Sequence, residues 1–153
     1  MKYNVINKKQ YYVLREAGTE RPSSSPLNKN YKKGISESIK FGVTQILKQE
    51  PDTEAILIIL GDQPKISITY LNDFLNLQAK FPDKIIASRY EKSLGIPAIF
   101  PKTLFNNLKD LTGDKGAKDL LIRNLPNIIT PKEKTDFFDI DTEQDYQHFL
   151  KNN

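Results

Sequence analysis

The stretch ILIILGDQP, residues 56–64, decides the fold. A continuous run of aliphatic residues without polar alternation is typical of a strand that is covered on both faces, as in the middle of a parallel sheet. We therefore predict a buried strand over residues 55–60. Asp62 then lies at the carboxyl end of this strand, which is the edge of open α/β sheets where ligands bind.

The composition limits the kinds of site that the chain could hold. Its 153 residues are 38% hydrophobic and 10% aromatic, as expected for a globular domain with a hydrophobic core. There is no cysteine and a single histidine, His148, which excludes disulfides, thiolate metal sites and His-rich zinc sites. Any metal must therefore bind oxygen ligands. No signal-peptide core or membrane-spanning run is present, so we expect a cytoplasmic protein without membrane contact.

The net charge of +4 is unevenly distributed, because residues 1–40 carry nine Lys and Arg but three Asp and Glu. A basic segment of this kind is a candidate for contact with phosphates or nucleic acid. It contains no motif of a known nucleic-acid reader. We therefore interpret it as solvated surface and do not expect nucleic acid as a partner.

Apolar periodicity predicts alternating helices and strands after residue 33. A helix over residues 34–49 precedes the strand 55–60, and a helix capped by Ser67 precedes a strand over 84–90. The apolar piece 96–100 then leads into the later elements. These are helices over about 102–111 and within 113–125, and short strands over 127–130 and 137–140. A last helix is capped by Thr142, with Asp145 as its capping-box partner. We expect Tyr146, Phe149 and Leu150 of this helix to pack inward.

The first 27 residues differ in kind from the rest. Residues 15–28, REAGTERPSSSPLN, form a polar stretch that contains Pro and Ser and has little to bury. We predict a poorly defined segment over 1–27, with YYVL at 11–14 as a candidate strand, followed by a folded domain over 28–153.

Two stretches carry carboxylates at predicted strand ends. Asp62, in Gly-Asp-Gln-Pro, could coordinate a hard cation such as Mg²⁺ or could simply form a turn before a helix. In DIDTEQD, residues 139–145, Asp139 and Asp141 lie on the same side of an extended segment, because side chains alternate with period two. They could share a cation, or Asp141 and Thr142 could merely start the helix.

Two further stretches place glycines at helix starts. TGDKGAKD, from residue 112, and NKNYKKGISES, from residue 28, both offer free backbone N–H groups to an anion. Each of them could equally be a plain helix-start loop.

Taken in order, the four stretches resemble the MobA-like nucleotidyltransferases of molybdenum-cofactor maturation, in particular their cytidylyltransferase branch. The resemblance runs from Asn28 to about Leu150 and includes a Gly-x-Pro-x-x-Phe element. The matching residues are Asn28, Tyr31, Gly34 and Ser38; Asp62, Gln63 and Pro64; Gly95, Pro97 and Phe100; Gly113 to Lys118; and Asp139 to Thr142 with Asp145.

The resemblance implies an α/β fold of three layers, the Rossmann-like nucleotidyltransferase fold of nucleotide-diphospho-sugar transferases, with a mostly parallel sheet. It implies that Mg²⁺ and a nucleoside triphosphate, CTP rather than GTP, lie over the strand ends. A pterin phosphate then displaces pyrophosphate from the α-phosphorus. Asp62 and Asp141 would be catalytic and would hold the metal together with Asp139.

The same resemblance implies a set of residues that contact the nucleotide or the acceptor. These are Asn28, Gly34, Ser38, Gln63, Pro64, Gly95, Pro97, Gly113, Asp114, Lys115 and Gly116. Many family members have His where Ile96 stands here, so this chain departs from the pattern in acceptor recognition.

One part of the family pattern has no counterpart in the sequence. The family carries a Gly-rich loop of the type L-A-A-G-x-S-x-R-x-G, ending in Lys, that grips the triphosphate, and nothing before Asn28 matches it. We therefore expect an N-terminally incomplete fold in which residues 11–14, a second copy or a partner chain completes the sheet. The chain is then either a slow nucleotidyltransferase or a non-enzymatic, degenerate binding module derived from the family.

Overall fold

The computed structural model describes residues 13–14, 28, 31–132, 135 and 137–152. Within them, a five-stranded sheet has the order β1-β2-β4-β3-β5. The strands are β1 (Val13–Leu14), β2 (Ala55–Ile58), β3 (Ile85–Arg89), β4 (Leu94–Pro101) and β5 (Ile128–Ile129).

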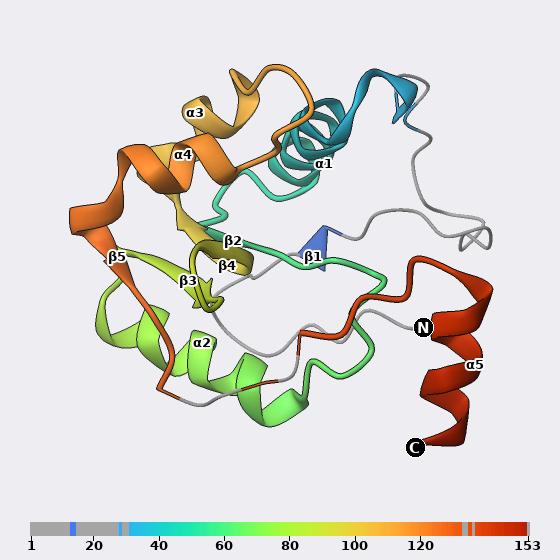
Figure 1. The fold of residues 1–153 in the computed structure, drawn as a ribbon. Coiled ribbons are helices and arrows are strands. Elements are labelled where there is room, and N and C mark those ends of the chain that lie inside the picture. The colour runs from blue at the N-terminus through green and yellow to red at the C-terminus, as the bar shows by residue number, and fades with distance from the viewer. Residues whose placement is uncertain (1–12, 15–27, 29–30, 133–134, 136, 153) are drawn as a thin grey trace.

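Helices cover both faces of this sheet (Figure 1). They are α1 (Ile35–Gln49), α2 (Ile68–Lys80), α3 (Phe105–Lys109), α4 (Lys118–Arg123) and α5 (Glu143–Lys151), with 3-10 turns at Tyr31–Lys33, Lys102–Leu104 and Leu125–Asn127. In Figure 1, α1, α3 and α4 lie on one face and α2 lies on the other. The predicted three-layer α/β fold is confirmed.

The strand predicted from residues 55–60 is internal, as expected, but the sheet is mixed rather than mostly parallel. Strand β2 pairs in parallel with β1 and antiparallel with β4. Strand β4 is also antiparallel to β3, because a short turn joins them in which the Tyr90 N–H donates to the Ser93 carbonyl at 2.9 Å. The parallel pairs are β1 with β2 and β3 with β5.

Strand β1 lies within the stretch predicted as a candidate strand at 11–14. Val13 pairs with Leu57 and Leu14 pairs with Ile58. The chain itself therefore covers part of the edge of β2, which is the first of the three expected ways of completing the sheet.

Successive residues of the strands enter two separate cores, as the pleat requires. Ile56 and Ile58 pack with the face that carries α1 and α3. Leu57 packs on the opposite face with Phe74 of α2. The predicted core residues Ile56, Ile58, Ile85 and Ile86 are all buried, whereas Leu60 is partly exposed because β2 ends at Ile58.

The C-terminal elements differ from the prediction. Residues 137–140 form no strand, since the backbone bond from Ile140 N–H to the Asp62 carbonyl is isolated. The Thr142–Asp145 capping box of α5 is confirmed. Tyr146 and Leu150 were expected inward but are 44% and 53% exposed, because α5 stands apart from the sheet in Figure 1.

Across the described residues, no helix combines the length and the apolar character needed to cross a membrane.

Candidate functional site

Several predicted site residues gather at one edge of the sheet. Strands β2 and β3 both run antiparallel to β4, so they point the same way and end at the same edge, where β4 begins. Asp62 follows β2, Tyr90 follows β3, and Gly95 lies at the start of β4. Residues 137–141 reach this edge too, because the N–H of Ile140 donates to the Asp62 carbonyl at 2.9 Å.

Asp62 has an unusual environment for an acidic residue. Its side chain is half-buried, and its Oδ1 is buried without a hydrogen-bond partner within the described part of the chain. A buried carboxylate oxygen that no donor satisfies is costly, so such an oxygen invites a cation or another ligand. This is the observation on which a metal site would depend.

Electrostatics support the same interpretation. Burial raises the pKa of Asp62 above its ordinary value, and the negative charges of Asp139 and Asp141 raise it further. The three residues, which we call the carboxylate cluster, therefore act on one another at this edge. No group of three or more His, Asp or Glu side chains among the described residues is arranged to enclose a metal. Mg²⁺ needs no such cage, because it commonly uses one or two carboxylates together with water and substrate phosphates.

Gln63 connects the cluster to the strands. Its side chain is 6% exposed. The amide Nε2 donates to Asp139 Oδ1 at 2.8 Å and to the Tyr90 hydroxyl at 3.1 Å. Gln63 was predicted as a contact of nucleotide or acceptor, but its amide hydrogens are occupied by the protein.

Tyr90 is a member of this site that sequence reasoning missed. Its hydroxyl donates to the Ile96 carbonyl, and its ring stacks on Phe137 with centroids 4.0 Å apart. The ring also lies against the backbone of Gly95, where an added Cβ would be 2.7 Å from Cε2 of Tyr90. The available signal was position, since Tyr90 directly follows a buried strand that is parallel to β2.

The two glycine stretches meet elsewhere, at the start of α1. Asp114 Oδ1 accepts a hydrogen bond from the Ile35 N–H at 3.2 Å, and a Cβ on Gly34 would lie 2.7 Å from this same oxygen. Gly116 packs against Ile35, with a built Cβ at 3.0 Å from Ile35 Cγ2. Asp114 therefore satisfies one of the free N–H groups of the helix start. We call Gly34, Gly113, Asp114 and Gly116 the glycine cluster.

The remaining predicted residues have varied surroundings. Asn28 Nδ2 donates at 3.5 Å to Ser38 Oγ, which lies in the first turn of α1. Lys115 pairs with Asp119 at 3.6 Å in an exposed ion pair. Pro64 is exposed, whereas the Pro97 side chain is fully buried and its carbonyl accepts from Ser88 Oγ. Pro97 is therefore inaccessible to a ligand as the site stands, whereas Pro64 faces solvent.

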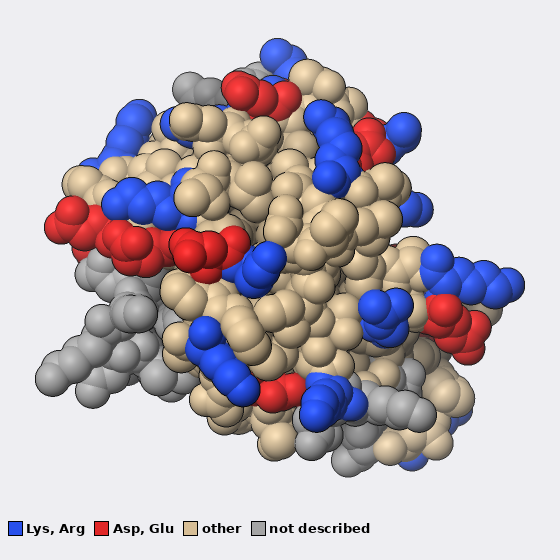
Figure 2. All heavy atoms as spheres, turned by 90° about the vertical axis from the view of Figure 1, so that its left-hand side faces the viewer, with Lys and Arg blue, Asp and Glu red and all other residues tan. Residues whose placement is uncertain are grey.

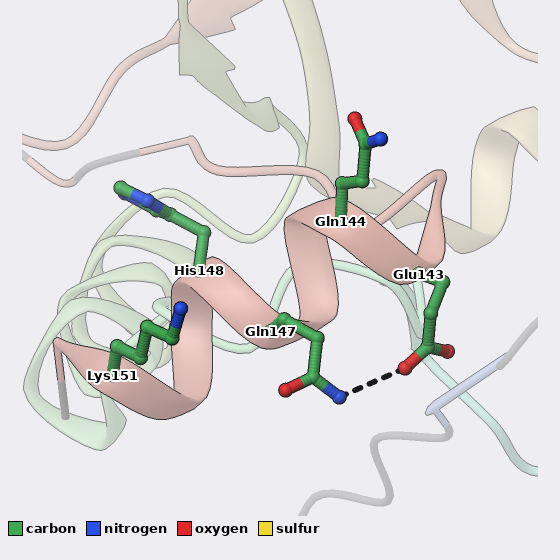
Figure 3. A pocket seen from close by; sticks show the side chains of 5 residues that line it. All are labelled: Glu143, Gln144, Gln147, His148 and Lys151. Atoms are coloured by element: carbon green, nitrogen blue, oxygen red, sulfur yellow. Dashed lines mark hydrogen bonds between the residues drawn. The ribbon is translucent and has the colours of Figure 1, made fainter.

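A surface hollow beside α5 is lined by other residues (Figure 3). They are Glu143, Gln144, Gln147, His148 and Lys151. All of them are exposed and come from one helix, and Glu143 accepts a hydrogen bond from Gln147 at 2.9 Å. No predicted site residue lines this hollow, so we place the candidate site at the carboxylate cluster.

Charges of both signs are mixed on the face shown in Figure 2. Its described Lys and Arg side chains are interspersed with Asp and Glu and separated by uncharged surface. This face therefore offers no stripe of a single charge of the kind that follows a nucleic-acid backbone.

Replacing Asp62 with Asn is expected to stabilise the metal-free protein at neutral pH. Because the pKa of Asp62 is raised in the folded state, its ionisation opposes folding, and the stability it contributes at low pH is lost as the pH rises through the folded pKa. Denaturation in EDTA should give a higher midpoint for Asp62→Asn at pH 7.5. The gap should close as the pH falls toward 3.8, the ordinary pKa of Asp.

The matched control for this comparison is Asp83→Asn, an exposed acid in the turn before β3. It should leave the midpoint unchanged at both pH values. An Asp62→Asn protein that is less stable at pH 7.5, or equally shifted at every pH, would contradict this account of Asp62.

Comparisons with known proteins agree with the fold. The sequence profile of the MobA-like NTP transferase domain matches residues 9–128. The purine catabolism protein PucB of Bacillus subtilis is 30% identical over 117 residues, which cover 74% of this chain and 55% of PucB. The chain thus spans about half the length of that relative.

Solved structures are also similar to this chain in fold. Rv0371c from Mycobacterium tuberculosis has a TM-score of 0.63 and 25% identity, covering 77% of this chain and 60% of that one. A second structure of Rv0371c is a complex with manganese. It has a TM-score of 0.57 and 25% identity, covering 75% of this chain and 60% of that one. Since the profile match extends over most of its length, the chain belongs to the family of MobA-like NTP transferase domains.

Proposed function

We propose that this chain transfers a nucleotidyl group from CTP, or less readily GTP, to the phosphate of a pterin in molybdenum-cofactor maturation, with Mg²⁺ as the metal. The observation that carries the proposal is the buried Oδ1 of Asp62 at the carboxyl end of β2, which has no hydrogen-bond partner among the described residues. The resemblance of the motifs to the cytidylyltransferase branch supports the choice of nucleotide and acceptor.

The residues of the edge fit a divalent cation. Asp62 offers a buried carboxylate oxygen, and Asp139 and Asp141 add negative charge within its electrostatic range. Oxygen ligands of this kind are those that Mg²⁺ and Mn²⁺ accept. When bound, the metal would screen the repulsion between phosphates and stabilise the charge that develops on the transferring group.

The contributions of the chain itself would be binding and orientation. Asp62 and Asp141 would hold the cation, with Asp139 as their neighbour. The glycine cluster, Asn28 and Ser38 would lie near the nucleotide or the acceptor, where the exposed Lys115 could meet a phosphate. The oxygen of the pterin phosphate would bond to the α-phosphorus as the bond to pyrophosphate breaks. Little covalent chemistry is then required of the protein.

The second candidate is a binding module that holds metal and acceptor without turnover. It is favoured by the lack of any sequence match to the Gly-rich loop that grips the triphosphate in the family. PucB is named a purine catabolism protein. An acceptor molecule connected with purine breakdown is therefore an alternative to the pterin phosphate.

The test is to incubate the purified chain with Mg²⁺, labelled CTP or GTP and molybdopterin, and to follow pyrophosphate release together with the binding of nucleotide and of molybdopterin. We expect metal-dependent binding with CTP preferred, and transfer well below the usual enzyme median of about 10 s⁻¹. Binding of molybdopterin without transfer would favour the binding module. A chain that binds neither a nucleotide nor molybdopterin in the presence of metal would contradict both candidates.

A further inference from the structure

The segment over residues 137–141 has no regular secondary structure, yet it brings two carboxylates to the site. Three of its contacts attach it to the body close to Asp62. Phe137 stacks on Tyr90, Asp139 accepts from Gln63, and the Ile140 N–H donates to the Asp62 carbonyl. The middle attachment is the one that fixes a carboxylate directly.

The orientation of the Gln63 amide is set by its neighbours. The Tyr90 hydroxyl gives its only hydrogen to the Ile96 carbonyl, so it can only accept from Gln63. Asp139, as a carboxylate, can likewise only accept. The reversed amide would place Oε1 against two groups that can only accept hydrogen bonds. The amide therefore lies with Nε2 toward these groups, and it donates one hydrogen to each of them.

This network leaves Gln63 Oε1 without a partner. The oxygen is buried and unpartnered within the described residues. An unsatisfied buried acceptor costs folding free energy, on the order of 1–3 kcal/mol. The amide therefore engages its surroundings through its donors alone, and both of them are directed to the site residues Tyr90 and Asp139.

We propose that Gln63 is a positioning residue that, oriented by Tyr90, holds the Asp139 carboxylate and with it the segment over 137–141 beside Asp62. The inference rests on the proposed function in one respect, namely that the carboxylate cluster binds a divalent cation. It assigns to the Gln of Asp-Gln-Pro a role through Asp139 in place of contact with nucleotide or acceptor.

The test uses the full chain and Mn²⁺ alone as probe, with free Mn²⁺ measured by electron paramagnetic resonance. Gln63→Leu should weaken Mn²⁺ binding by about 10-fold or more, the usual effect of losing a residue that orients a ligand. Tyr90→Phe, which keeps the ring on Phe137 and Gly95, should weaken it less but in the same direction.

A double-mutant cycle shows whether Gln63 acts through Asp139. In the Asp139→Asn background, Gln63→Leu should cost little further affinity, because the partner that it orients has lost its charge. An equal loss in both backgrounds would overturn the inference, since Gln63 would then act on the metal independently of Asp139.

Gln78 provides a matched control for the loss of a buried amide. It is 4% exposed and donates from Nε2 to the Pro82 carbonyl at 2.7 Å, and its Oε1 also has no partner in the part of the chain that the structure describes. Gln78→Leu should change the free energy of unfolding as Gln63→Leu does. Its Mn²⁺ affinity should stay within about twofold of wild type, because Gln78 shares no partner with the carboxylate cluster.

Hydrogen exchange of the Ile140 amide gives a second readout that needs no metal. It should speed up by about tenfold or more in Gln63→Leu and remain at the wild-type rate in Gln78→Leu, because local opening follows the loss of local contacts. Unchanged exchange together with unchanged Mn²⁺ affinity would overturn the inference. If the wild-type chain binds no Mn²⁺, the proposed function fails, and the exchange rate of Ile140 still decides the role of Gln63.

Discussion

Asp62→Ala is expected to weaken Mn²⁺ binding by at least about 100-fold and to slow metal-dependent nucleotidyl transfer by about 1000-fold. Loss of a residue that merely orients a ligand already costs about 10- to 100-fold in metal affinity, and Asp62 is the proposed ligand itself. The metal contributes several kcal/mol of transition-state stabilisation, and each 1.4 kcal/mol is tenfold in rate, so a fall of about 1000-fold in rate is expected.

This variant should remain folded, because Asp62 Oδ1 has no hydrogen-bond partner to lose among the described residues. Its thermal unfolding can therefore be compared directly with that of wild type. Asp83→Ala removes an exposed acid from the turn before β3 and controls for the change in net charge. An Asp62→Ala protein with wild-type Mn²⁺ affinity would contradict the assignment of Asp62 as a metal ligand.

Gly34→Ala is expected to lower the free energy of unfolding by about 3 kcal/mol, the second large effect. Gly34 has φ of 107° and ψ of 172°, a conformation that only glycine adopts readily and that costs another residue about 1–3 kcal/mol. The new Cβ would also lie 2.7 Å from Asp114 Oδ1 and displace it from the Ile35 N–H. Loss of such a cap costs about 1 kcal/mol.

Gly113→Ala is the matched control, because Gly113 has φ of 73° but no atom of the described residues lies within 4 Å of a built Cβ. It should lower the free energy of unfolding by only the cost of the left-handed backbone conformation, about 1–2 kcal/mol. Asp114→Ala in the Gly34→Ala background should recover part of the larger loss by removing the contact. Urea denaturation of the four proteins measures these differences. Equal losses for the two glycine variants would show that the contact with Asp114 is unimportant.

The positions of Asp62 and of the α1 helix start could be predicted from sequence because each depends on a local pattern. The aliphatic run before Gly61 predicted a buried strand, and the apolar spacing after Gly34 predicted a helix that the structure begins at Ile35. The capping residues Ser67 and Thr142 were also correct, since a cap is a contact over three residues.

Features that depend on pairing between distant segments could not be predicted in this way. The direction of β4 follows from the turn after Tyr90, and no periodicity distinguishes a parallel neighbour from an antiparallel one. Tyr90 became part of the site only through contacts with Gln63 and Phe137, 27 and 47 positions away. The exposure of Tyr146 depends on where α5 lies, which its own amphipathic pattern does not specify.

The measurement that tests the central claim most directly is the anomalous scattering of Mn²⁺ in crystals of the full chain. We predict one strong peak at about 2.0–2.3 Å from Asp62 Oδ1, with Asp139 or Asp141 reaching it directly or through one water. A peak elsewhere, such as in the hollow of Glu143 and His148, with none at Asp62, would contradict the account.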